Sequence, residues 1–204
     1  GERVIGYKVG CTGPGTRTQF GMDGPIRGTL FAGEALLNKT SINPNEFCQL
    51  AIEGEMAISV GENYEIEAAF PVIELPNFLS RSNKKTLSEF IANNGINAGI
   101  VLPETKWQES TKYIRDGGVL TLSINGSDIG NAGLWPNDGG PEESLIWLKN
   151  NLIEYGIDFV PGDIVLAGTA LGLYPVKDGD EIVVYIDGES AVSCSIKTPH
   201  TTSI

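Results

Sequence analysis

Residues 51–60 read AIEGEMAISV, and the spacing of apolar and charged residues in this stretch predicts a β-strand. Because successive side chains of a strand point to opposite faces, one face would carry Ile52, Met56, Ile58 and Val60, and the other Glu53, Glu55, Ala57 and Ser59. We expect the first face to lie in a hydrophobic core. On the second face, two carboxylates would lie side by side among small residues, which leaves room for something to bind between them.

Two neighbouring carboxylates repel each other, so they need a proton or a cation unless the face is fully hydrated. A hard divalent ion such as Mg²⁺ or Mn²⁺ suits carboxylate oxygens and keeps coordination positions open for a substrate. The alternative is a solvated outer face of a half-buried strand, in which case Glu53 and Glu55 bind nothing.

Glu74 is the one charged residue in the apolar run AAFPVIELP at residues 68–76, and an ionised side chain is rarely buried without a partner. Glu74 could form an ion pair with a nearby basic residue such as Arg81, or reach water at the end of a strand. Together with Glu53 and Glu55, it would instead complete a three-carboxylate metal site with open positions.

Length and composition limit the other possibilities. A chain of 204 residues is long enough for one good core, so we expect a single domain over residues 1–204. A formal net charge of −12 argues against a nucleic-acid or anionic-membrane partner. No stretch has the length and apolar character of a membrane span, and no leader opens the chain. The three cysteines are far apart without a CxxC pair, which favours reduced thiols and a cytoplasmic setting.

The single histidine, His200, lies in a polar tail. Ser-His-Asp and Cys-His catalysis and histidine-rich zinc sites are therefore not expected. Proton transfer would fall to Lys, Glu, Asp, Tyr or metal-bound water. Lys8 is a candidate, because it is a lone cation in the glycine-flanked strand GYKVG at residues 6–10, although it could also be a surface lysine with a partly buried stem.

The chain reads mostly as short strands separated by Gly, Pro and Asn, which predicts a strand-dominated α+β fold. Expected strands cover residues 4–10, 29–31, 51–60, 68–76, 164–167, 181–187 and 191–196. One helix is expected over residues 86–94, with a capping box at its start and Gly95 at its end. A second is expected over residues 141–155, with an apolar stripe at Leu145, Leu148, Leu152 and Ile153 and with Gly156 as its stop.

Six blocks in order carry a family resemblance: GYKVG (6–10), QFGMDGPIRGTL (19–30), IEGEMA (52–57), FPVIE (70–74), IANN (91–94) and PGDIVLAG (161–168). In these blocks the chain resembles the 2-keto-4-pentenoate hydratase and 4-oxalocrotonate decarboxylase family of the fumarylacetoacetate hydrolase superfamily. The resemblance implies a β-roll of the superfamily's C-terminal domain type with a few flanking helices. It also implies a Mg²⁺ or Mn²⁺ ion on Glu53, Glu55 and Glu74, and a catalytic role for Lys8.

The resemblance further implies a small 2-oxo acid or its dienol as substrate, and catabolism of aromatic compounds as the setting. Lys8 would neutralise the substrate carboxylate or move a proton. Gln19, Asn94 and Thr169 are predicted to bind substrate, although Thr169 could be a simple turn residue. We expect a homo-oligomer and, as family hydratases and decarboxylases form complexes with each other, a complex with such a relative.

The chain departs from the family pattern at four places, which leaves the reaction open. The hydratases usually have an aspartate where this chain has Ile26, and the family has an Asp-Ser-Arg type stretch where this chain has Pro76-Asn77-Phe78. An acid and a hydroxyl of the family pattern are missing from Ala92 to Ile96, and the family's N-terminal helical segment is not present before Lys8. Three functions compete. They are a hydratase of 2-hydroxypenta-2,4-dienoate type, a decarboxylase of a 2-oxo-enedioate or hydrolase of an acylpyruvate, and a non-catalytic relative that serves as a partner subunit.

Overall fold

The computed structural model describes residues 1–13, 18, 24–79, 86–115 and 117–199. In this structure the stretch at 51–60 forms strand β5 (Ala51–Val60), which lies in the middle of the larger sheet. Among the described residues, eight strands make up this sheet. Seven follow one another in the order β2 (Ile26–Phe31), β1 (Val4–Gly10), β10 (Ile164–Leu166), β5, β6 (Ile66–Pro76), β7 (Asn97–Leu102) and β3 (Ala35–Leu37), and β11 (Tyr174–Pro175) pairs with β5.

A second sheet has the order β4 (Thr40–Ile42), β13 (Glu189–Ile196), β12 (Glu181–Ile186), β8 (Val119–Ile124) and β9 (Ser127–Gly133). Parallel pairs occur in both sheets, at β1–β10, β3–β7 and β4–β13, whereas the other pairs are antiparallel. The helices are α2 (Leu87–Ala92), α3 (Thr105–Gln108) and α4 (Gly140–Glu154), with short 3-10 turns η1 (Ala32–Glu34), η2 (Pro44–Glu46), η3 (Asn94–Ile96) and η4 (Lys112–Ile114). Mixed sheets with few helices confirm the expected α+β class.

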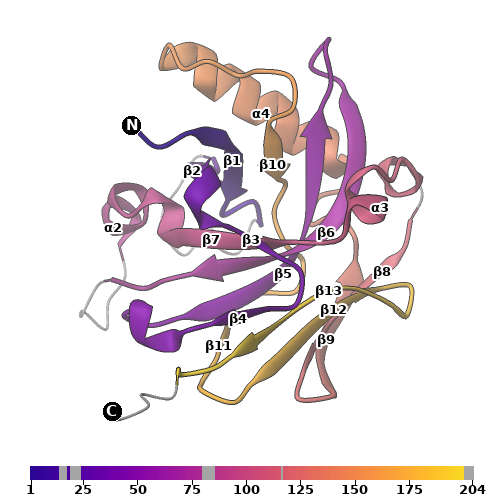
Figure 1. Ribbon diagram of the computed structural model, residues 1–204. Coiled ribbons are helices and arrows are strands. Elements are labelled where there is room, and N and C mark those ends of the chain that lie inside the picture. The colour runs from indigo at the N-terminus through magenta and orange to yellow at the C-terminus, as the bar shows by residue number, and fades with distance from the viewer. Residues whose placement is uncertain (14–17, 19–23, 80–85, 116, 200–204) are drawn as a thin grey trace.

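The two sheets pack against each other, with the second sheet below β5 and β6 in Figure 1. Gly54 marks how close they come, because a Cβ atom there would lie 3.2 Å from Val184 Cγ2 and 3.6 Å from Leu122 Cβ. One face of β5 carries four side chains that are fully buried: Ile52, Met56, Ile58 and Val60. The prediction that this face of the strand lies in the core is therefore confirmed.

Helix α4 lies beside β10 at the top of Figure 1, and Ser144 fixes it there by donating a hydrogen bond to Ala167 O at 2.8 Å. Leu145, Leu148 and Leu152 are buried, as the apolar stripe predicted. The inclusion of Ile153 in that stripe was wrong. Its side chain is 69% exposed, because one further residue turns it about 100° around the helix from Leu152.

The helix expected over residues 86–94 begins as predicted, since Thr86 accepts from Glu89 N while the Glu89 carboxylate accepts from Thr86 N. It ends earlier than predicted, at Ala92. Asn94 adopts a left-handed φ of 56°, and its side chain binds the backbone of β2, so the helix cannot continue to Gly95. Strands β3, β4, β7, β8, β9 and β11 were not predicted.

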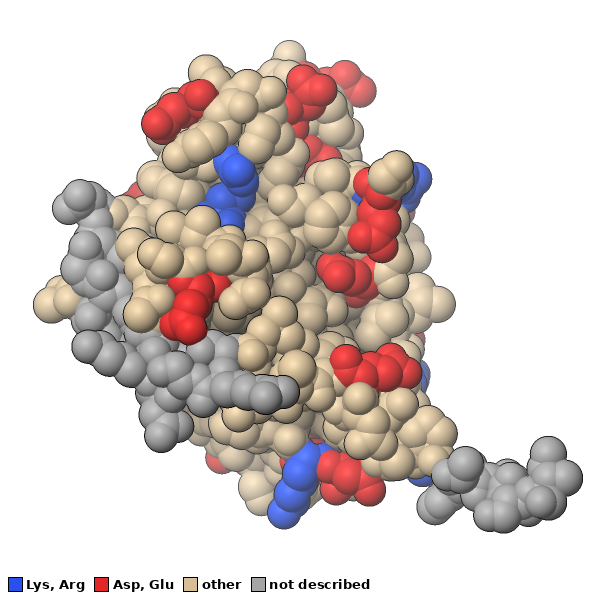
Figure 2. Space-filling view, turned by 90° about the vertical axis from the view of Figure 1, so that its left-hand side faces the viewer, with Lys and Arg blue, Asp and Glu red and all other residues tan. Residues whose placement is uncertain are grey.

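Figure 2 shows acidic side chains spread over the visible face with few basic ones among them, in line with the strongly negative net charge. None of the helices in the described ranges combines the length and apolar character that crossing a membrane requires.

Candidate metal centre and cavity

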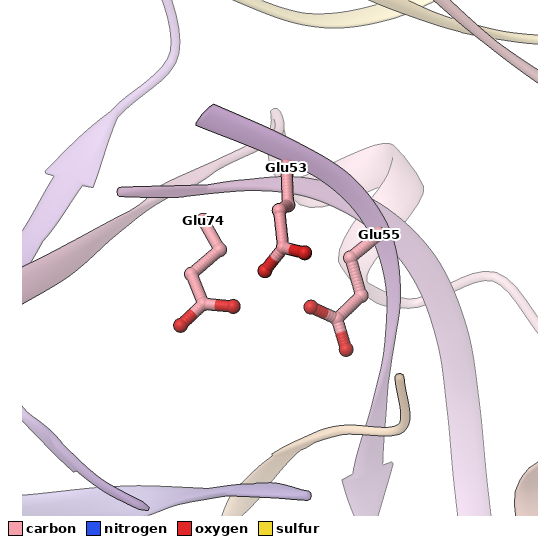
Figure 3. Close-up of side chains that lie close together, drawn as sticks. All are labelled: Glu53, Glu55 and Glu74. Carbon is pink, nitrogen blue, oxygen red and sulfur yellow. The ribbon is translucent and has the colours of Figure 1, made fainter. Parts of the chain in front are cut away.

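The three glutamates singled out by sequence come together where β5 pairs with β6. Glu53 and Glu55 project from the same face of β5, and the antiparallel register places Glu74 of β6 directly opposite Glu53. One carboxylate oxygen from each residue lies within 4.8 Å of the other two. Figure 3 shows the three carboxylates pointing toward one another. Strand alternation and cross-strand pairing together therefore create a cluster of three acids.

Most of this cluster is buried. Glu55 is 2% exposed and Glu74 is fully buried, whereas Glu53 is partly buried, so the alternative of a solvated outer face is wrong. Burial, together with the charge of Glu74, raises the pKa of Glu53 to about 8 despite the opposing effect of Lys8. Burial and the charges of Glu74 and Glu53 also raise the pKa of Glu55 well above its usual range. Without a metal ion, protons would have to neutralise part of the negative charge of this cluster.

Lys8 is the cation that the structure places against the three acids. It is 5% exposed, and its Nζ donates to Glu74 Oε1 at 2.6 Å and to Gly95 O at 3.2 Å. Burial alone would lower the pKa of Lys8, but the charges of Glu74, Glu53 and Glu55 outweigh that effect and raise it. The surface-lysine alternative is therefore wrong. Arg81, considered as the partner of Glu74, lies outside the described residues.

Glycines make room for the Lys8 side chain. A Cβ atom on Gly28, which pairs with Lys8 across β1 and β2, would lie 2.9 Å from Lys8 Cγ and 2.5 Å from Asn94 O. A Cβ atom on Gly95 would lie 3.5 Å from Lys8 Cδ. The aliphatic stem therefore passes between two backbone segments that can approach this closely because they carry no side chain.

The two oxygens of Glu74 have different surroundings. Oε1 accepts from Lys8 Nζ and also from Asn97 Nδ2, at 2.8 Å. Oε2 is buried and has no hydrogen-bond partner among the described residues. Sequence reasoning missed Asn97, although a polar residue at the start of the otherwise apolar strand NAGIVL was an available signal.

Glu55 is held from the opposite side by the backbone. Gly168 N donates to Glu55 Oε1 at 2.5 Å, and Gly168 has a left-handed φ of 98°. A side chain at this position would also collide with Thr12. Glycine at position 168 thus allows the loop after β10 to bring an N–H group to the carboxylate.

The predicted substrate-binding residues have different positions. Thr169 lines the cavity, but its hydroxyl donates to Gly54 O at 2.6 Å and accepts from Leu171 N at 3.0 Å, as in a turn. The Asn94 side chain is paired in both directions with the backbone of Thr29, at 2.6 and 2.8 Å, and is not among the residues that line the cavity. Gln19 lies outside the described residues.

A cavity of about 320 Å³ opens beside the cluster. Lys8 and the three glutamates line it. The rest of the wall includes a set of apolar side chains: Ile26, Phe78, Phe90, Ile96 and Leu173. Cys11 and Thr12, which sequence reasoning did not single out, also line it. The cavity is thus lined by a group of charged side chains and by several apolar ones.

No family model matches the chain. Its sequence is similar to a TodF product hydratase from Pseudomonas putida, with 27% identity over an alignment of 211 residues that covers 96% of this chain and 77% of the relative. It is also similar to a 2-keto-4-pentenoate hydratase from Burkholderia vietnamiensis, with 26% identity over 208 residues, 94% of this chain and 78% of the relative.

Two solved structures show the same fold. One is 4-oxalocrotonate decarboxylase from Pseudomonas putida G7, complexed with magnesium and adipate, with a TM-score of 0.86, 21% identity, and coverage of 96% of this chain and 79% of that one. The other is fumarylpyruvate hydrolase from Pseudomonas aeruginosa in complex with Mn²⁺ and pyruvate, with a TM-score of 0.70, 16% identity, and coverage of 97% and 91%.

Proposed function

We propose that this chain belongs to the 2-keto-4-pentenoate hydratase and 4-oxalocrotonate decarboxylase family of the fumarylacetoacetate hydrolase superfamily. We further propose that it is a divalent-metal-dependent lyase that hydrates the dienol of a small 2-oxo acid. The observation that carries the proposal is a cavity lined by three converging carboxylates, a lysine and several apolar side chains. Such a cavity suits a substrate with one anionic, chelating end and one apolar end.

The carboxylates fit a hard divalent ion. All the donors are oxygens, and the negative charges of Glu53, Glu55 and Glu74 exceed the single charge of Lys8. Glu74 Oε2 is buried without a hydrogen-bond partner in the described part of the chain. Mg²⁺ and Mn²⁺ both satisfy these conditions, and we propose Mg²⁺ as the working ion with Mn²⁺ as its substitute. When bound, the ion would act as a Lewis acid that stabilises negative charge on the enol oxygen of a 2-oxo acid.

Lys8 would act on the substrate carboxylate. Its ion pair with Glu74 keeps it charged, and it lines the cavity, so an anionic substrate entering there meets the positive charge of Lys8. In this state Lys8 can attract a carboxylate or give up a proton, whereas it cannot accept one. Attraction of the carboxylate would orient the chain of the substrate toward the apolar wall.

The apolar wall favours hydration over decarboxylation of a 2-oxo-enedioate. A dicarboxylate would bring a second negative charge toward Ile26, Phe78 and Leu173, and within the described part of the chain Lys8 is the one cationic residue that lines the cavity. A buried carboxylate without a partner costs several kcal/mol or more, at roughly the scale of charge burial in proteins. A substrate with one carboxylate and a short alkenyl tail avoids this cost.

We also propose a domain organisation, an assembly and a cellular environment for this protein. We infer one catalytic domain over residues 1–204 with the superfamily's β-roll, a homo-oligomer that can associate with a related hydratase or decarboxylase, and a reducing, cytoplasmic environment. Free thiols at Cys11, Cys48 and Cys194 are consistent with the last of these.

An assay with a panel of 2-oxo acids tests the function. The protein is incubated with 2-hydroxypenta-2,4-dienoate, a longer monocarboxylic dienol, a 2-oxo-enedioate and an acylpyruvate, in Mg²⁺, Mn²⁺ or EDTA, while the ultraviolet signal of the dienol and the release of CO₂ are followed. We expect metal-dependent loss of the dienol signal without CO₂. CO₂ release would identify a decarboxylase instead, cleavage of the acylpyruvate would identify a hydrolase, and metal binding without any turnover would identify a non-catalytic partner subunit.

A further inference from the structure

Asn97 is the first residue of β7 and lies behind Glu74, where it is buried and outside the cavity wall. We infer that Asn97 is a positioning residue, which fixes the Glu74 carboxylate so that Oε2 faces the metal site and thereby sets the affinity for the divalent ion. This inference rests on the proposed function, since it assigns Asn97 a task at the same metal site.

Two hydrogen bonds to Glu74 reach the same one of its two carboxylate oxygens. Lys8 Nζ and Asn97 Nδ2 both donate to Oε1, at 2.6 and 2.8 Å, and neither donates to Oε2. A carboxylate can rotate about its terminal bond, so a single donor on a long flexible stem, such as Lys8, could follow either oxygen. A second donor attached to the neighbouring strand selects which oxygen is held and which is left for the ion.

The oxygen of the Asn97 amide gives a second reason to assign it this role. Its Nδ2 is directed at Glu74 and, at 3.4 Å, at Gly99 O, whereas its Oδ1 is buried without a hydrogen-bond partner among the described residues. A buried acceptor without a donor destabilises the fold, and an apolar residue of the same size would avoid that loss. The unpartnered Oδ1 therefore gives the amide no advantage, and what the amide supplies at this position is the hydrogen bond from Nδ2 that orients Glu74.

The backbone before Asn97 supports the same conclusion independently. Asn94, Gly95 and Ile96 have successive φ angles of 56°, 63° and 62°, and a β-branched residue such as Ile96 is unfavourable in this left-handed region. The two hydrogen bonds between Asn94 and Thr29 hold the turn in place. This strained turn presents Gly95 O to Lys8 and leads directly into Asn97, so both donors on Glu74 Oε1 depend on it.

Replacement of the amide by an apolar group of similar size tests the inference. The parent protein and Asn97→Leu are titrated with Mn²⁺ alone by calorimetry at a temperature where circular dichroism shows both to be folded, and each is then thermally unfolded in EDTA. We expect Asn97→Leu to weaken Mn²⁺ binding by about 10-fold to 100-fold. The unfolding temperature in EDTA should change little, because removal of the unpartnered Oδ1 offsets the loss of the hydrogen bond to Glu74.

Asn125→Ala is the matched control, because Asn125 also donates to a carboxylate, Asp180, at 2.9 Å, but lies between β8 and β9 of the second sheet. It should lower the unfolding temperature and leave the Mn²⁺ affinity unchanged. Parent-like Mn²⁺ affinity in Asn97→Leu, with or without lower stability, would overturn the inference and leave the proposed function intact. Should Asn97→Leu fail to fold, the same comparison is made with Asn97→Ala. A parent protein that does not bind Mn²⁺ overturns the inference and the proposed function together.

Discussion

The two faces of strand β5 differ in almost every physical respect although they share one backbone. The face toward the second sheet carries Ile52, Met56 and Ile58, which are fully buried and need no polar partner. The opposite face carries Glu53 and Glu55, which repel each other and Glu74 and which border a cavity. The first face stabilises the fold, whereas the second reduces stability unless a cation is bound. Substitutions on the two faces should therefore have different consequences.

The largest effect is expected from removing charge on the cavity face. Replacement of both Glu53 and Glu55 by Gln keeps their shape but removes two negative charges, so metal binding and metal-dependent turnover should be lost completely. The protein should still fold, since crowded buried carboxylates destabilise it when no ion is present. Calorimetry with Mn²⁺, circular dichroism and thermal unfolding with and without Mg²⁺ check these outcomes.

The matched control replaces the exposed residues Glu62 and Glu67 by Gln, which makes the same change in net charge away from the cavity. This control should bind Mn²⁺ like the parent protein. Metal-dependent turnover in the Glu53 and Glu55 double variant would show that the metal site has been assigned to the wrong residues.

The next largest effect is expected from Lys8, the cation on the cavity face. Lys8→Met leaves Glu74 buried beside two other acids without its ion pair, so the free energy of unfolding of the metal-free protein should fall by about 3 to 5 kcal/mol. Turnover should fall by about 100-fold or more, because the positive charge facing the substrate is lost. Chemical denaturation in EDTA and steady-state kinetics with Mg²⁺ measure the two effects.

Lys106→Met is the control for Lys8→Met, because Lys106 forms an exposed ion pair with Glu189 at 3.6 Å. Its loss should change stability by less than about 1 kcal/mol. Equal behaviour of the two methionine variants would remove Lys8 from the proposed site.

A smaller effect, of a different kind, is expected on the core face. Ile58→Ala creates a cavity next to the second sheet and should lower the free energy of unfolding by about 2 to 5 kcal/mol. The Mn²⁺ affinity of the folded protein should not change, because Ile58 points away from the carboxylates. Denaturant unfolding combined with Mn²⁺ calorimetry separates the two faces, and a large loss of affinity in Ile58→Ala would mean that they are coupled.

The last expected effect is a dependence of stability on pH in the metal-free protein. The pKa of Glu53 rises from 4.5 to about 8 on folding, so between these values the folded state binds more protons than the unfolded state. The free energy of unfolding should therefore be highest below about pH 4.5 as far as this group is concerned, and should decrease as the pH rises toward 8. Thermal unfolding across this range in EDTA measures the slope.

Mg²⁺ should remove this dependence, because the ion takes the place of the proton. Glu53→Gln in EDTA should also have a shallower slope than the parent protein. A metal-free protein that became more stable between pH 5 and pH 8 would contradict the raised pKa of Glu53.

The sequence by itself determined the local features of this protein. Alternation along residues 51–60 placed Glu53 and Glu55 on one face, the capping box at Thr86 began helix α2, and Gly156 ended α4 with a left-handed φ of 62°. These features depend on residues a few positions apart, which is the range that periodicity and capping rules describe. The same local pattern did not determine whether the acidic face of β5 is exposed to solvent or buried.

Only the tertiary structure decided how the site is assembled. The register of β5 with β6 placed Glu74 opposite Glu53, the neighbouring position of β1 brought Lys8 to Glu74, and the turn before β7 brought Asn97 to the same carboxylate oxygen. Lys8 and Glu74 are 66 positions apart in the chain. Pairing between strands so distant in sequence is set by packing of the whole sheet and not by any local pattern, so the ion pair of Glu74 with Lys8 and its hydrogen bond with Asn97 could not be found from the sequence.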